Sequence, residues 1–141
     1  MMKTIKIQSR LFVILIPVFN TIYGQKLDVS LRYKMDLIAP KLNEVAKPYF
    51  TNRSEILKKY GNIGEDGKIK TIPMDDGREQ LDITDEGADL LNQLGDTEAE
   101  FQIAPLSLED FQLLLFNLKG FQFLPNEWAM VKLLIDMSET A

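Results

Sequence analysis

The chain contains no cysteine and no histidine among its 141 residues. Without these residues it has no disulfide framework, no Cys/His zinc site, no thiol nucleophile and no Ser-His or Cys-His catalytic pair. The motifs GxxxxGK[ST], GxGxxG, GxSxG and HExxH are also absent. The sequence therefore predicts no catalytic residue, no bound cofactor and no metal, and we expect a protein that is not an enzyme.

Long hydrophobic runs are scarce as well. The most apolar segment, Leu11 to Ile16, is soon followed by Pro17 and Asn20, so it is too short and too interrupted for a membrane-spanning helix. Basic residues precede it and Gly24-Gln25 follows it, which is the pattern of a secretory signal peptide. Its apolar residues also recur at helical spacing over 11–23, which predicts a helix buried in the core. We favour a core helix within residues 1–24, with a cleaved signal peptide as the alternative.

The net charge of −5 is unevenly distributed. Residues 1–25 carry +3, residues 26–60 carry +4 and residues 61–141 carry −12. The acidic half either packs beside the basic half or faces a basic partner protein. No long basic stripe with interleaved aromatic residues is present, so direct nucleic-acid binding is not expected.

The longest periodic segment is 29–60. Apolar and small polar side chains recur there at alternating spacings of three and four, which places them on one face of a long helix. These stripe residues are Met35, Ile38, Leu42, Val45, Tyr49, Asn52 and Ile56. Pro40 and Pro48 interrupt the segment but not the spacing, so we expect one kinked helix, with a break near Pro40 as the alternative.

The remaining segments predict short elements of both types. Residues 66–104 contain two Asp-Gly turns, and apolar and polar residues alternate around Ile69, Leu81 and Ile83, which predicts a β-hairpin. A short helix follows, and then a third strand that could join the hairpin. Residues 107–136 predict two C-terminal helices, the first opened by a capping box at Ser107. The expected fold is a single α+β domain over 1–141, mainly α, with a helical hairpin, a small antiparallel sheet and short closing helices.

Two groups of side chains are candidate partner surfaces. The first is acidic and could hold a metal ion or perform acid–base chemistry, but solvated turn and cap residues are the simpler interpretation. Its members are Asp75, Asp76, Asp82, Asp85, Glu86 and Asp89. The second is aromatic and either closes the core or binds a protein. Its members are Phe121, Phe123 and Trp128.

Several segments together resemble a family of small proteins of unknown function encoded by tailed phages and prophages. The resemblance covers about residues 25–136 and rests on "QKLDVSLRYKMDLIAPKLNEVAKPYFTNRSEILKKYG", "EDGKIK", "DTEAEFQIAPLSLEDF" and "LPNEWAMVKLLI". It implies that residues 1–24 belong to the fold, and it supplies no catalytic residues. Pro40 and Pro48 depart from the uninterrupted long helix of this family.

From these observations we expect a phage-type protein that acts through protein–protein interaction. Its role would be virion or tail assembly, or inhibition of a host or defence factor. Its partner would be a phage structural protein or a basic host protein, and a homo-oligomer is possible. We expect it in the host cytoplasm or associated with the virion. The alternative is a secreted or periplasmic small protein.

Overall fold

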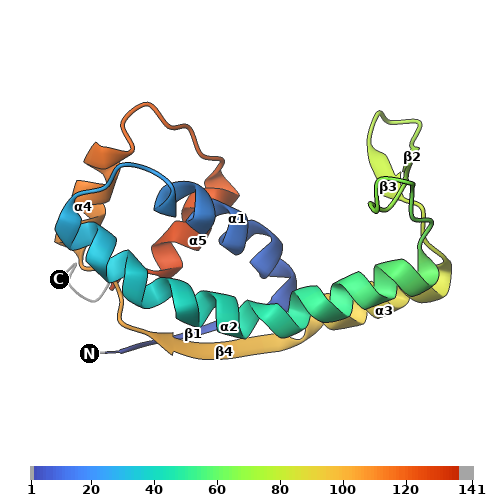
Figure 1. The fold of residues 1–141 in the computed structure, drawn as a ribbon, viewed down its shortest axis with the longest axis horizontal. Coiled ribbons are helices and arrows are strands. Elements are labelled where there is room, and N and C mark those ends of the chain that lie inside the picture. The colour runs from blue at the N-terminus through green and yellow to red at the C-terminus, as the bar shows by residue number, and fades with distance from the viewer. Residues whose placement is uncertain (1, 137–141) are drawn as a thin grey trace. The chain divides into compact units, whose positions relative to one another are not determined.

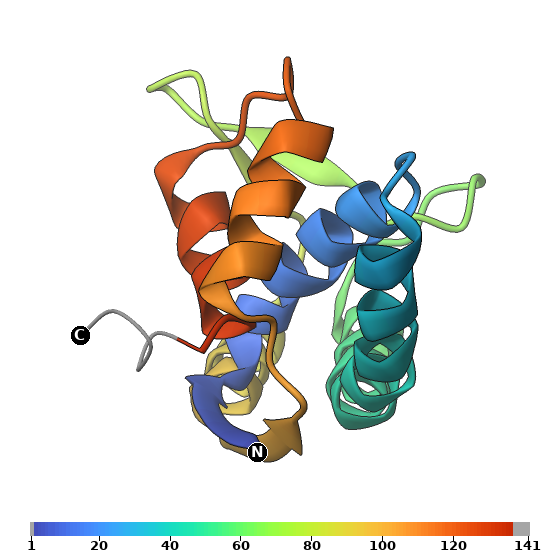
Figure 2. The ribbon, with the colours of Figure 1, turned by 90° about the vertical axis from the view of Figure 1, so that its left-hand side faces the viewer.

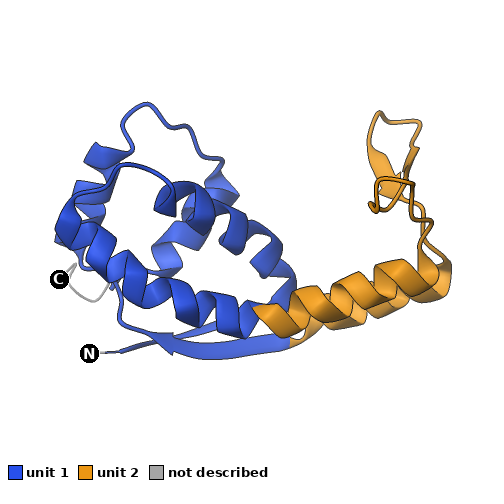
Figure 3. Cartoon of the chain, in the orientation of Figure 1, with its two compact units in different colours: residues 1–46, 98–141 blue, residues 47–97 orange. Residues whose placement is uncertain are grey.

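The computed structural model of the chain describes residues 2–136. These residues form an α+β fold that is mainly helical, as the sequence predicts, with five α-helices and two antiparallel sheets of two strands each (Figure 1). They divide into two compact units, which are residues 1–46 with 98–141 (unit 1) and residues 47–97 (unit 2), shown in Figure 3. Each unit is described separately below.

Unit 1 contains a sheet of two strands, β1 (Lys3–Gln8) and β4 (Glu98–Ile103), that pair antiparallel with Ile5 opposite Phe101. Alternate residues of both strands point to one buried face, because side chains in a strand alternate between its faces. In Figures 1 and 2 the helices of this unit lie on one side of the sheet.

Two features of these strands differ from the sequence expectation. Residues 3–8 form β1, so the core helix favoured within 1–24 is confined to Phe12–Tyr23, the part that has helical apolar spacing. Residues 98–103 pair with β1 and do not join the hairpin of unit 2. In both cases an alternating segment is stabilised by a partner strand 90 to 100 residues away in the chain, which a local pattern does not reveal.

The helices of unit 1 are α1 (Phe12–Tyr23), the first half of α2 (Val29–Tyr60), α4 (Leu108–Asn117) and α5 (Pro125–Leu133). A short 3-10 turn, Ser9–Leu11, leads from β1 into α1. Helix α1 packs against α5, and the ring of its Phe12 lies 6.3 Å from that of Phe101 in β4. Helix and sheet therefore share one apolar core.

Helix α2 is continuous from Val29 to Tyr60, so the prediction of one helix over 29–60 is confirmed and the alternative of a break near Pro40 is wrong. Both prolines are exposed. As far as Tyr49, four of the five predicted stripe residues are buried, and the fifth, Val45, is half-buried. The four buried residues are Met35, Ile38, Leu42 and Tyr49. Beyond that point Leu57 is buried, whereas Asn52 is exposed and Ile56 is half-buried.

Unit 2 contains the second half of α2, a hairpin of β2 (Thr71–Pro73) and β3 (Glu79–Leu81), and α3 (Asp85–Asp96). Gly67 and Gly77 adopt positive φ angles of 79° and 87°, which explains the Asp-Gly pair at each predicted turn. Residues 71–80 are all exposed, and the predicted buried residues Ile69, Leu81 and Ile83 are half-buried. The hairpin is therefore held mainly by backbone hydrogen bonds.

Candidate functional site

The predicted aromatic residues form a cluster at one end of α5 in unit 1. The ring of Trp128 lies 5.1 Å from that of Phe123 and 6.3 Å from that of Phe111 in α4, both in edge-on geometry. Phe121 stacks on Phe123 at 6.0 Å. The structure thus brings Phe121, Phe123 and Trp128 together. Edge-on and offset packing are favoured arrangements of aromatic rings.

Exposed apolar side chains occur along the same stretch of the chain, from the end of α4 through the loop that precedes α5. Four large apolar side chains between residues 115 and 124 face solvent, and we call them the apolar segment. They are Leu115 (43% exposed), Phe116 (74%), Phe121 (42%) and Leu124 (63%). Exposed apolar side chains concentrated in one stretch are typical of protein-binding surfaces.

Local interactions define the course of this loop. Gly120 has a φ of 97°, a conformation that glycine tolerates, and it turns the chain after α4. At the start of α5 the Leu124 backbone N–H donates a 2.7 Å hydrogen bond to Glu127 Oε1, and Pro125 occupies the first turn. The Asn117 Oδ1 atom accepts a 2.8 Å hydrogen bond from the Asp28 backbone, which attaches the end of α4 to the residues just before α2.

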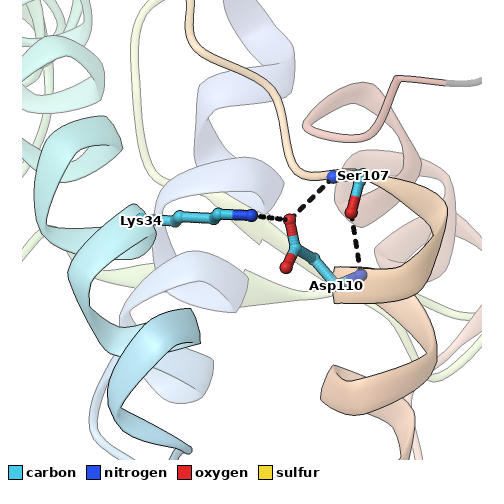
Figure 4. A network of polar contacts seen from close by, with 3 residues as sticks. All are labelled: Lys34, Ser107 and Asp110. Carbon is cyan, nitrogen blue, oxygen red and sulfur yellow. Dashed lines mark hydrogen bonds and ion pairs between the residues drawn. The ribbon is translucent and has the colours of Figure 1, made fainter.

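A polar network connects α4 to α2 within unit 1 (Figure 4). Ser107 Oγ accepts a hydrogen bond from the Asp110 N–H at 3.0 Å, and Asp110 Oδ2 accepts one from the Ser107 N–H at 2.9 Å. This is the capping box that the sequence predicts, with Asp in the place of Glu. Lys34 Nζ of α2 adds an ion pair to the same oxygen at 2.6 Å.

Asp110 is one of two buried polar residues in the described part of the chain. Burial alone would raise the pKa of its carboxyl group. The hydrogen bonds from Lys34 and Ser107, with the charge of Lys34, outweigh that effect and hold the pKa below its usual value. The network keeps a charged carboxylate between two helices. The Lys34 ammonium binds this carboxylate, while the Ser107 hydroxyl caps the helix.

The predicted acidic residues lie in unit 2, at different points of its hairpin and helix. Asp75 and Asp76 occupy the β2–β3 turn, where Asp76 accepts hydrogen bonds from the backbone N–H and the side chain of Arg78, at 3.0 and 2.6 Å. These bonds lower the pKa of Asp76. Asp82 follows β3 and accepts a 2.9 Å hydrogen bond from Asn62 Nδ2.

The other three acidic residues belong to α3. Asp85 and Glu86 lie in its first turn and Asp89 in the next, all exposed. Thr84 caps this helix by accepting a 3.1 Å hydrogen bond from the Gly87 N–H, and carboxylates near a helix N-terminus are favoured by its dipole. Among residues 2–136, no group of three or more carboxylates is arranged to hold a metal ion.

Unit 2 also has a groove of about 390 Å³ between the end of α2 and α3. Its lining combines apolar side chains with three polar ones. The lining residues are Asn52, Glu55, Ile56, Lys59, Tyr60, Leu90 and Leu94. The sequence assigns Asn52 and Ile56 to a buried stripe, so this surface was not among the predicted sites.

The chain was compared with known protein families, curated proteins and solved structures, and none of the three comparisons found a match. Within residues 2–136, no helix has the length and apolar character required to cross a membrane.

Proposed function

We propose that the chain is a non-enzymatic, phage-type interaction protein that binds another protein through the apolar segment of unit 1. Its partner is a phage structural protein met during virion or tail assembly, or a basic host protein that it inhibits. It acts in the host cytoplasm or in the virion.

The observation that carries this proposal is the exposure of Phe116, Phe121 and Leu124, in the segment whose Phe121 stacks on Phe123 of the Trp128 cluster. Large apolar side chains are costly to leave in water, and aromatic anchors in a well-packed surround contribute most of the affinity at many interfaces.

The packing of the first residues supports a protein that retains its N-terminal segment. Ile5, Ile7, Phe12 and Leu15 are buried in the core of unit 1. Cleavage after Gly24, which the alternative of a secreted or periplasmic protein requires, would remove all four. The intact mass of protein made in its host distinguishes these two forms.

The experiment is a pull-down from host lysate and from phage-infected cells with the full chain and two variants. Phe116→Ser with Phe121→Ser removes two exposed anchors, and we expect at least a tenfold loss of the partner. Val13→Ser is the matched control, because Val13 is 44% exposed but lies in α1, outside the apolar segment. It should bind like the unmodified chain.

The identity of the captured protein separates the two roles. Phage structural proteins would indicate assembly, and a basic host protein whose binding weakens with salt would indicate inhibition. A partner bound equally by the double variant and the unmodified chain would contradict the proposed surface. Turnover of a substrate by the purified chain would contradict the non-enzymatic assignment.

A further inference from the structure

Unit 2 leaves most of its apolar side chains incompletely covered. Among residues 47–97, the buried large apolar side chains are Tyr49 and Leu57, at 8% and 9% exposure. In α3 the buried residues are Gly87 and Gly95, whereas Leu90, Leu91 and Leu94 are half-buried. An amphipathic helix normally buries its leucines, so α3 has an apolar face that its own unit does not close.

That face adjoins the similar face of α2. Ile56 and Tyr60 lie one turn apart on α2, Leu90 and Leu94 lie one turn apart on α3, and all four line the groove. Two helices with a shared apolar face commonly complete their core by packing against further helices, as in four-helix bundles.

The charges beside the groove indicate which helices would complete it. Glu55 and Lys59 both line the groove and lie four residues apart on α2. If a two-fold axis crosses α2 between them, perpendicular to the helix, Glu55 faces Lys59 of the partner subunit. The reciprocal pair forms by symmetry, as in any isologous interface. The Glu55 and Lys59 charges of one copy are thus complementary to the same two charges of a second copy.

We propose that a second copy of this chain occupies the groove, so that the α2–α3 faces of two copies pack together in a two-fold dimer. Two Glu55–Lys59 pairs lie at its two-fold axis, and Ile56, Leu90 and Leu94 pack beside them. A strongly acidic or strongly basic partner would gain little from Glu55 and Lys59, because their opposite charges cancel. The dimer surface lies in unit 2 and is separate from the apolar segment of unit 1.

The test is the dimer dissociation constant of the full chain and four variants, measured by sedimentation equilibrium. Glu55→Lys alone and Lys59→Glu alone each replace two attractive pairs with two repulsive ones, and we expect each to weaken the dimer by about tenfold. The double variant restores both pairs in reversed orientation and should return to within about threefold of the original. Lys58→Glu is the control, because Lys58 is exposed and does not line the groove.

Circular dichroism of each variant verifies that the helices are retained. A chain that stays monomeric up to high protein concentration would overturn the proposal, with the groove then available to a different partner. A double variant as weak as either single variant would also overturn it. The Phe116→Ser/Phe121→Ser variant should dimerise normally, so failure of the proposed function and failure of this dimer are distinguishable.

Discussion

The two units of this chain differ in how they are stabilised (Figure 3). Among residues 2–136, 23 apolar residues are buried, of which 21 belong to unit 1 and two to unit 2. Unit 1 follows the usual arrangement, in which alternating strand residues and helix stripes meet in one core. Unit 2 relies on backbone hydrogen bonds, two glycine turns and a helix pair with a groove on its surface.

We therefore expect the two units to differ in how well they tolerate substitutions. A residue inside a closed core affects the stability of everything packed around it, because protein interiors are close to fully packed. A residue in unit 2 affects fewer neighbours, so a substitution there should act locally or through binding. Substitutions in the two units test this contrast.

The first prediction concerns Leu42 in the first half of α2, which is 1% exposed. Leu42→Asp places a charge in the core of unit 1 and should lower the free energy of unfolding by more than about 4 kcal/mol, enough to unfold the protein. Asn43→Asp puts the same acid on the adjacent exposed position and should cost less than about 0.5 kcal/mol. Urea denaturation measures both.

The same substitution at Ile56 sharpens the contrast. Ile56 is half-buried in unit 2, so Ile56→Asp should cost about 1 kcal/mol or less in dilute solution, where the chain is monomeric. A cost at Ile56 as large as that at Leu42 would mean that unit 2 is as closed as unit 1. A cost at Leu42 below about 1 kcal/mol would show that the buried stripe is wrongly assigned.

The second prediction concerns Gly87, a closely packed position of α3 in unit 2. A Cβ atom there would lie 2.5 Å from Tyr60 Cβ and 2.7 Å from Ile83 Cγ1. Gly87→Ala should therefore destabilise unit 2 by about 1–3 kcal/mol through overpacking. Hydrogen exchange should show faster opening of α3, with α1 and β4 unchanged. An equal increase in amide exchange rates in both units would contradict the expectation that the substitution acts within unit 2 alone.

The third prediction concerns the pH dependence that Asp110 gives to unit 1. Its pKa is lowered on folding, so its stabilising contribution is complete above the usual Asp value near ~3.9 and is lost as pH falls through the lower folded value. Asp110→Asn keeps a hydrogen-bond acceptor but cannot titrate, so its stability should fall less between pH 5 and about 2.

At neutral pH, Asp110→Ala should cost about 1–2 kcal/mol, because it removes the capping box and the Lys34 ion pair together. Glu109→Ala is the control on the same helix turn, because Glu109 is exposed. Denaturation at a series of pH values measures these differences, and identical acid profiles for Asp110→Asn and the unmodified chain would contradict the role of the network.

Much of the architecture could be predicted from local patterns. Four features depend on residues that are close together in the sequence, and the structure confirms them. They are the limits of α2, the capping box at Ser107, the Asp-Gly turns and the helix after Thr84. The pairing of β1 with β4 could not be predicted, because Lys6 and Glu100 become neighbours only when the chain folds, 4.0 Å apart.

The surfaces were harder to predict than the elements. The density of aromatic residues indicates Phe121 and Trp128. The exposure of Phe116 could not be predicted, because residues 113–116 are all apolar and no polar residue among them marks the solvent-facing side of the helix. The spacing that continues from Tyr49 to Ile56 predicts burial for Ile56. Whether that position is buried depends on how many helices pack around it, and the periodicity of one helix gives no information on that number.

Native-state hydrogen exchange of the full chain tests most directly the claim that unit 1 has a closed core and unit 2 does not. We expect amides of α1, β1, β4 and α5 to open only with global unfolding, and those of α3 and the hairpin to open at a lower free energy. Equal protection of both units at low protein concentration would contradict the account and would favour the single cooperative domain expected from the sequence.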